Sequence, residues 1–247
     1  KDGRMGENSK IEWTDATWNP IAGCAPVSPG CAHCYAVTMT RRLEAMGNKD
    51  YAGLTTAKHF NGKIRLLKDR LEQPLRRKKP TIYFVNSMSD LFHEDVPVGF
   101  LTDVFAVMGE AYWHTFQVLT KRIERARVFL NGVTKPLPNV WIGTSVENQA
   151  RKYRIDQLRK IPAVLRFLSL EPLLENIGEL DLRGIGWVIV GGESGPHARP
   201  CNIEWIRDIV QQCKAAAMPV FVKQDSGQWP GQQGCIPNEL WIKEFPR

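Results

Sequence analysis

The sequence lacks the long hydrophobic runs that would place it in a membrane. No stretch approaches the roughly 18 consecutive apolar residues of a membrane-spanning helix, and no signal-peptide pattern opens the chain. These features exclude a helical membrane protein, and we expect a cytoplasmic protein with no membrane partner. The 247 residues suffice for one large α/β domain with a buried core. We expect that domain to span residues 5–247, with residues 1–4 as an expression remnant.

Cysteine is sparse as well, and its distribution argues against disulfide bonds. The six cysteines are expected to stay reduced in the cytosol. Three of them, Cys24, Cys31 and Cys34, stand in one short segment, which we call the cysteine loop (residues 23–34). Prolines and glycines hold such a segment in turns. Because a structural metal site normally closes all four positions with protein ligands, three thiolates predict a [4Fe–4S] cluster with one iron open for chemistry.

Two other interpretations of the cysteine loop stay open. A Cys-x-x-Cys pair is also typical of half a zinc site or of a thiol redox pair, and His33 is the only local candidate for a fourth zinc ligand. The remaining cysteines, Cys201, Cys213 and Cys235, are widely spaced and include no Cys-x-x-Cys pair. We therefore do not expect them to hold a second cluster.

The chain carries an excess of positive charge. Lysine and arginine number 33 against 26 acidic residues, a net charge of +7, which favours polyanionic partners such as nucleic acid or nucleotides. Basic residues gather at 76–79, 121–127 and 151–160. If these segments flank the mouth of a barrel, they form a collar for a phosphate backbone. A flipped or single-stranded base is then the expected substrate. Solvated helix faces are the plainer interpretation of the same residues.

Short apolar runs alternate with helical patterns along the chain. The predicted strands cover residues 81–85, 115–119, 140–143, 164–168, 187–190 and 219–222, and the segment before Cys24 is a further first strand. The predicted helices cover residues 35–46, 97–111, 122–131, 148–160 and 203–217. Continuous apolar strands alternating with helices indicate parallel strands buried on both faces. The sequence thus predicts an α/β partial (βα) barrel of about six or seven parallel strands, with the cysteine loop after the first strand.

Polar and charged residues follow most of these strands. They include Asn86, His93, Lys121, Ser145, Glu171, Glu193 and Lys223. Because an active site of a βα barrel is built at the carboxyl ends of its strands, we expect a pocket there, lined by Asn86, Ser145, Glu171 and Glu193. His93 is a weak candidate for a proton shuttle, and Lys121 and Lys223 are weak candidates for contacts with a carboxylate or phosphate. A helix cap for His93 and salt bridges for the lysines are the structural alternatives.

Several short motifs together resemble a known family. They are IEWTD at 11–15, WNP at 18–20, GC at 23–24, GCAHCYA at 30–36, SDLFHE at 89–94, LTKR at 119–122, SVEN at 145–148, SLEPLL at 169–174 and VGGESGP at 190–196. In these motifs the chain resembles the phage-associated three-cysteine-motif family of unknown function, a radical S-adenosylmethionine-like group. The resemblance spans roughly residues 10–225.

The resemblance implies a partial barrel whose loop after the first strand binds a [4Fe–4S] cluster through Cys24, Cys31 and Cys34. S-adenosylmethionine would chelate the open iron, and an electron donor would reduce the cluster, so that a 5′-deoxyadenosyl radical forms. The residues expected to bind this cofactor are Tyr35, Asn86, Ser145, Glu171, Gly191, Gly192 and Glu193. The first cysteine gap has six residues and His33 precedes the third cysteine, which leaves Tyr35 as the aromatic candidate for stacking on adenine.

Three classes of function are compatible with these features. The first is a radical S-adenosylmethionine enzyme acting on a nucleic acid, nucleotide or modified base. The second is a nucleic-acid-binding module that carries an iron–sulfur or zinc centre without turnover, and the third is a barrel hydrolase or lyase with structural cysteines. Iron and sulfide content separates the first class from the third, and production of 5′-deoxyadenosine separates the first from the second.

Overall fold

The protein folds around one parallel β-sheet that curls into a partial barrel. The computed structural model describes residue 9, residues 11–133 and residues 135–246, so the predicted remnant at 1–4 lies outside the described residues. The sheet has seven strands in the order β1-β4-β5-β6-β7-β8-β9, and each pairs in parallel with its neighbours. Their bounds are β1 (Ala16–Trp18), β4 (Ile82–Val85), β5 (Thr115–Thr120), β6 (Val140–Ser145), β7 (Leu165–Leu170), β8 (Trp187–Gly191) and β9 (Val220–Gln224).

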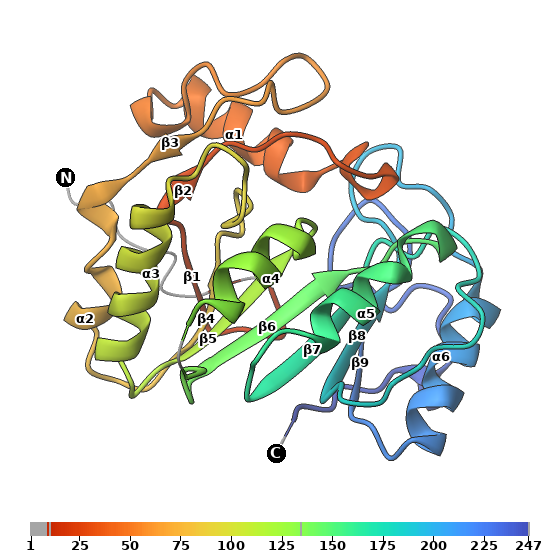
Figure 1. Cartoon of the computed structure of the whole chain (residues 1–247). Helices are drawn as coiled ribbons and strands as arrows, with labels where there is room; N and C mark the ends of the chain where they lie inside the picture. The colour runs from red at the N-terminus through yellow and green to blue at the C-terminus, as the bar shows by residue number, and fades with distance from the viewer. Residues whose placement is uncertain (1–8, 10, 134, 247) are drawn as a thin grey trace.

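Helices connect the strands and cover the outer face of the sheet (Figure 1). They are α1 (Tyr35–Ala45), α2 (Gln73–Arg76), α3 (Val98–Glu110), α4 (Ile123–Asn131), α5 (Tyr153–Arg159) and α6 (Ile203–Ala215). The apolar faces of α2 to α6 pack on outward-facing strand residues in one large core, whereas α1 packs in a separate smaller cluster with residues of the region around β2 (Ile21–Ala22) and β3 (Arg65–Leu66). None of the described helices is long and apolar enough to cross a membrane.

The observed architecture confirms the predicted partial barrel and most of its elements. Each predicted strand overlaps an observed one, and seven is the upper end of the predicted number. The predicted helix at 148–160 is shorter than expected, because α5 begins at Tyr153 after a single 3-10 turn. In that turn the main chain of Gln149 donates to Glu175, and its side chain donates to the carbonyl of Asn176, which ties the segment to a neighbouring loop. An antiparallel pair of short strands, β2 (Ile21–Ala22) and β3 (Arg65–Leu66), was not predicted, since two-residue strands leave no pattern.

Aromatic side chains fill the inside of the partial barrel. Trp13, Phe84, Phe167, Trp187 and Phe221 form an inner cluster separate from the outer core, and each is at least nine-tenths buried. Strand β6 has a glycine, Gly143, where it faces this cluster. A Cβ on Gly143 would lie 2.5 Å from ring atoms of Phe167. The inner cluster therefore forms an apolar floor beneath the carboxyl ends of the strands.

Candidate active site

The cysteine loop lies across the carboxyl ends of the strands. Parallel pairing brings all of these strand ends to one edge of the sheet, as sequence reasoning predicted. Figure 1 shows the segment from β2 to α1 crossing the end toward which the strand arrows point. Contacts from four separate strand ends hold the loop and the first residue of α1 in place. These four tethers define the candidate site.

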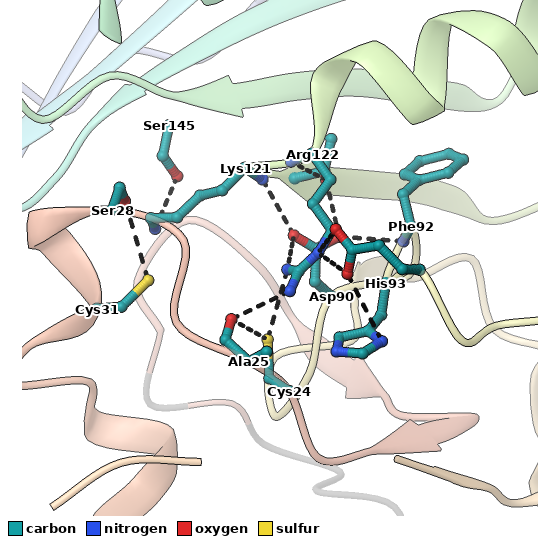
Figure 2. Close-up of polar contacts among 12 residues, drawn as sticks. Cys24, Ala25, Ser28, Cys31, Asp90, Phe92, His93, Lys121, Arg122 and Ser145 are labelled. Atoms are coloured by element: carbon teal, nitrogen blue, oxygen red, sulfur yellow. Dashed lines mark hydrogen bonds and ion pairs between the residues drawn. The ribbon is translucent and has the colours of Figure 1, made fainter. Parts of the chain in front are cut away.

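The first tether is Arg122, which follows β5 (Figure 2). Its Nη1 donates to the Sγ of Cys24 at 3.6 Å and its Nη2 donates to the carbonyl of Ala25 at 3.1 Å. Two carboxylates balance its charge, since Nη1 lies 3.3 Å from Oδ2 of Asp90 and Nε lies 2.9 Å from Oε2 of Glu94. Only 5 % of the Arg122 side chain is exposed. A buried cation thus lies against the first cysteine of the loop.

The second tether is Glu147, which follows β6. Its fully buried carboxylate accepts a hydrogen bond from Ser28 of the cysteine loop and lies 3.0 Å from Nη1 of Arg154. Gly30 makes this approach possible, because a Cβ at that position would lie 2.7 Å from the Glu147 side chain. Next to it, Nζ of Lys121 donates to the hydroxyl of Ser145 at 3.2 Å.

The third tether is Glu193, which follows β8. Its Oε2 lies 2.9 Å from Nδ1 of His33, and it also accepts hydrogen bonds from the main chain and guanidinium of Arg199. Burial by itself raises the pKa of Glu193, but the hydrogen bonds from Arg199 and His33 hold it below its usual range. The glycines at 191 and 192 let β9 approach closely, since a Cβ on Gly192 would meet Ser226 at 2.4 Å. The carboxylate of Glu193 is thus engaged by protein donors.

The fourth tether is Tyr35, whose hydroxyl donates to the main-chain oxygen of Ser87 after β4 at 2.6 Å. The side chain is half exposed while its hydroxyl end is covered, and burial raises the pKa of that hydroxyl, with smaller contributions from Cys34 and Glu171. One end of Tyr35 is therefore fixed near the loop while the ring stays accessible.

The three thiols of the cysteine loop are unpaired and influence one another. None of them forms a disulfide. Burial, and then the charge of Asp90, raise the pKa of Cys24 to about 12, while Arg122 opposes the rise. Burial also raises the pKa of Cys34, and Cys31 adds to the effect. Arg122 alone does not bring the pKa of Cys24 down to its usual range. A bound metal would deprotonate the thiols outright.

Asn86 directly follows β4, and its side-chain amide is buried without a hydrogen-bond partner among the described residues. Its side chain is 3 % exposed, and within the described part of the chain neither its oxygen nor its nitrogen has a hydrogen-bond partner. Its φ of 59° lies in the left-handed region, which asparagine tolerates better than most residues. A buried polar group without a partner is costly, so this amide is suited to binding a ligand.

The remaining predicted residues are Glu171, Lys223 and His93. Glu171, after β7, lies 3.0 Å from Nζ of Lys223 at the end of β9. His93 is 3 % exposed, and its Nδ1 accepts a hydrogen bond from the main chain of Asp95. Burial, and then Arg122, lower the pKa of His93. Nζ of Lys121 lies 3.9 Å from Oε1 of Glu147, so both lysines form the ion pairs that were the structural alternative. His93 belongs to the loop that supports Arg122.

The predicted basic collar does not form. Residues 76–79 precede β4, and the carbonyl of Arg77 accepts a hydrogen bond at 2.8 Å from Trp113, just before β5. This segment lies at the amino ends of the strands, so the prediction that it flanks the barrel mouth is wrong. In the other two segments, Arg122, Arg154 and Arg159 are paired with carboxylates. Carboxylates within the protein therefore neutralise part of the positive charge of these two segments.

Other candidate sites lie outside this constellation. Cys213 is buried in α6, Cys201 is partly buried and Cys235 is exposed. Across residues 11–133 and 135–246, no three His, Cys, Asp or Glu side chains are grouped to hold a single metal ion. Cluster ligands bind different irons and do not converge on one point. A cavity of about 670 Å³, lined mainly by apolar residues of α3 and α4, lies away from the cysteine loop.

Sequence reasoning missed several charged residues of the site. Arg122 and Arg154 were counted as basic clusters, and Asp90 and Arg199 were not singled out. A single charged residue next to a strand does not reveal its partner in the sequence. Arg122 and Asp90 are 32 residues apart, and Arg154 and Glu147 are 7 residues apart. Only the position of Arg122 and Asp90 inside the LTKR and SDLFHE motifs pointed to them.

The chain belongs to the family described as Protein of unknown function (DUF5131), whose model matches residues 8–238. No curated protein matches it in sequence. Among solved structures it is similar to a cysteine-to-serine mutant of spore photoproduct lyase, with 13 % identity and a TM-score of 0.45 over 86 % of this chain and 64 % of that one. It is also similar to a double mutant of that lyase with bound AdoMet and dinucleoside spore photoproduct, with 14 % identity and a TM-score of 0.45 over 83 % and 62 %. These TM-scores are too low to assign an activity or a ligand.

Proposed function

Within this family of unknown function, we propose that the chain is a radical S-adenosylmethionine enzyme whose cysteine loop binds a [4Fe–4S] cluster with one open iron. The observation that carries the proposal is the placement of Cys24, Cys31 and Cys34. They stand free of disulfides on a loop that four strand ends hold over the mouth of a partial barrel. The relationship to a phage-associated three-cysteine-motif group stays a prediction.

The residues present fit such a cofactor chemically. Three thiols supply soft ligands, which suit iron–sulfur clusters. The raised pKa values of Cys24 and Cys34 mean that the empty loop keeps these thiols protonated, and that a bound cluster would stabilise the thiolates. Arg122 donates toward Cys24, and the hydroxyl of Ser28, which donates to Glu147, lies 3.9 Å from the Sγ of Cys31. Polar neighbours of this kind commonly surround metal ligands.

When bound, the cluster and S-adenosylmethionine would supply the electron and the C–S bond whose cleavage yields a 5′-deoxyadenosyl radical. The chain's own residues bind and orient the cofactor. Asn86 offers its unpartnered amide to polar groups of the ligand. Tyr35 presents an accessible ring for adenine, and Ser145 and Glu171 are the further residues assigned to the cofactor. The aromatic floor beneath excludes water from the reacting end.

A nucleotide, nucleic acid or modified base is the proposed substrate class. The support is the net charge of +7, reduced by the internal pairing of Arg122, Arg154 and Arg159. Glu193, His93 and Lys121 act in this proposal by holding the loop and its surroundings, and Lys223 by fixing Glu171. An external one-electron donor is a necessary partner.

Anaerobic reconstitution tests the proposal. We expect a brown protein with about four irons and four sulfides per chain, and release of 5′-deoxyadenosine after reduction with S-adenosylmethionine present. Cys24→Ala, Cys31→Ala and Cys34→Ala should each lose the cluster. Cys235→Ala, at an exposed cysteine outside the loop, is the matched control and should retain it.

Two outcomes would contradict the proposal in different ways. A colourless protein with stoichiometric zinc would favour the binding module without turnover. A full cluster that never releases 5′-deoxyadenosine would leave the cysteine assignment intact but remove the radical chemistry.

A further inference from the structure

Arg122 is the one cationic side chain that donates to a cysteine of the loop in the described part of the chain. Its Nη1 lies 3.6 Å from the Sγ of Cys24, whereas Cys31 has the neutral hydroxyl of Ser28 at 3.9 Å, and that hydroxyl donates its proton to Glu147. Figure 2 shows the guanidinium inserted between the loop and the strand end, with contacts on both sides. The three thiols therefore do not share one electrostatic environment.

The position of Arg122 is fixed on every side. Four oxygen atoms from three residues hold its planar guanidinium in addition to sulfur: one carboxylate oxygen of Asp90, both oxygens of Glu94 and the carbonyl of Ala25. Asp90 is fixed in turn by the hydroxyl of Thr120 at 2.7 Å and by the main chain of Lys121 at 3.1 Å. A donor held in this way keeps its geometry when charge changes beside it.

The charges around Arg122 act on Cys24 in opposite directions. Asp90 disfavours negative charge on the sulfur and Arg122 favours it. Hydrogen bonds to cluster sulfurs and local charge are among the factors that set the reduction potential of an iron–sulfur centre. We propose that Arg122 is a positioning residue that raises the reduction potential of the cluster through its contact with Cys24, within limits set by its two carboxylate partners. This inference rests on the proposed function.

The electron balance of the affected step is simple. The cluster accepts one electron from an external one-electron reductant, no bond forms or breaks, and the cluster gains one negative charge. A fixed positive charge at Cys24 stabilises the reduced form more than the oxidised form. Removal of the cation should therefore lower the potential, and removal of a nearby carboxylate should raise it.

The test is a redox titration of the reconstituted full-length protein, followed by electron paramagnetic resonance. In Arg122→Gln, reduction should become about tenfold less favourable, which is a midpoint lower by about 59 mV for one electron. In Glu94→Gln the midpoint should rise by a smaller amount, because Glu94 is 63 % exposed and its charge is screened. Glu110→Gln, an exposed carboxylate at the end of α3, is the matched control and should leave the midpoint unchanged.

Opposite signs in the two variants separate electrostatic tuning from loosening of the loop, which would shift both in the same direction. If Arg122→Gln keeps a full cluster at an unchanged midpoint, the inference fails and the proposed function stands. If Arg122→Gln does not hold a cluster, Glu94→Gln decides, and a midpoint that is unchanged or lower overturns the inference. If the wild-type protein takes up no cluster, the proposed function fails and this inference fails with it.

Discussion

Glu147 and Arg154 form the most deeply buried ion pair of the site, and replacement of Glu147 by glutamine should destabilise the fold strongly. Both side chains are at most 2 % exposed, and the atoms of the pair lie 3.0 Å apart. Glutamine keeps the shape but removes the negative charge, so Arg154 retains only the carbonyl of Ser145, at 2.8 Å, as a strong acceptor. Loss of one partner of a buried pair costs about 3–5 kcal/mol.

The measurement is urea denaturation of the protein without cofactor, together with thermal unfolding. For a domain of this size, about 1 kcal/mol lowers Tm by about 2–4 °C, so Glu147→Gln should lower it by about 6–20 °C. Asp156→Asn is the matched control, because Asp156 pairs with Arg159 on the same helix but its side chain is 66 % exposed. That exposed pair should contribute less than about 1 kcal/mol.

A double variant separates loss of charge balance from loss of packing. Glu147→Gln combined with Arg154→Met removes both charges and should recover a large part of the lost stability, since a buried pair replaced by neutral groups is often tolerated. If Glu147→Gln costs no more than Asp156→Asn, or if the double variant is less stable than the single one, the reasoning from buried charge is refuted.

Three further predictions concern Gly143 beside the inner aromatic cluster, His93 in the loop that supports Arg122, and the side-chain amide of Asn86. Gly143→Ala should cost about 1–3 kcal/mol in urea denaturation, because the added Cβ would lie 2.5 Å from the Phe167 ring; an unchanged midpoint would mean that the inner cluster shifts freely. His93 has a lowered pKa, chiefly through burial, so the free energy of unfolding should be level above pH about 6.5 and fall as the pH drops through the folded value. His93→Gln should flatten that acid slope, and an identical slope in both proteins would contradict the assignment. Asn86→Gly should leave the fold as stable or more stable, because it removes unpartnered polar atoms at a positive φ, yet weaken S-adenosylmethionine binding in an equilibrium titration; unchanged affinity would exclude Asn86 from the cofactor site.

The strand ends were predictable from the sequence because they follow from chain direction. Buried parallel strands are continuous apolar runs, and the first polar residue after each run, such as Asn86 or Glu171, must emerge at the shared edge. The same rule places residues 76–79 at the opposite edge, since they precede β4. Their net charge suggested a partner surface, but their place before a strand already excluded the barrel mouth.

The pairing of charges at the site was not predictable in the same way. Arg122 looks like part of an exposed basic run, and only the folded sheet brings Asp90 and Glu94 beside it. Glu193 was expected to bind the cofactor, and nothing in the sequence indicated that Arg199 and His33 would contact its carboxylate. Periodicity reports the burial of apolar residues, and it carries no information about which buried charges meet.

The four tethers have a consequence for the order of events during synthesis. The Cys24–Arg122 contact joins residues 98 apart in the chain, and the His33–Glu193 contact joins residues 160 apart. At about 5–20 residues per second on the ribosome, about 8–32 s pass between the emergence of His33 and that of Glu193. During that interval the cysteine loop is outside the ribosome without its full set of anchors. If the loop binds a cluster as proposed, the loop reaches the geometry for loading only after β8 has joined the sheet.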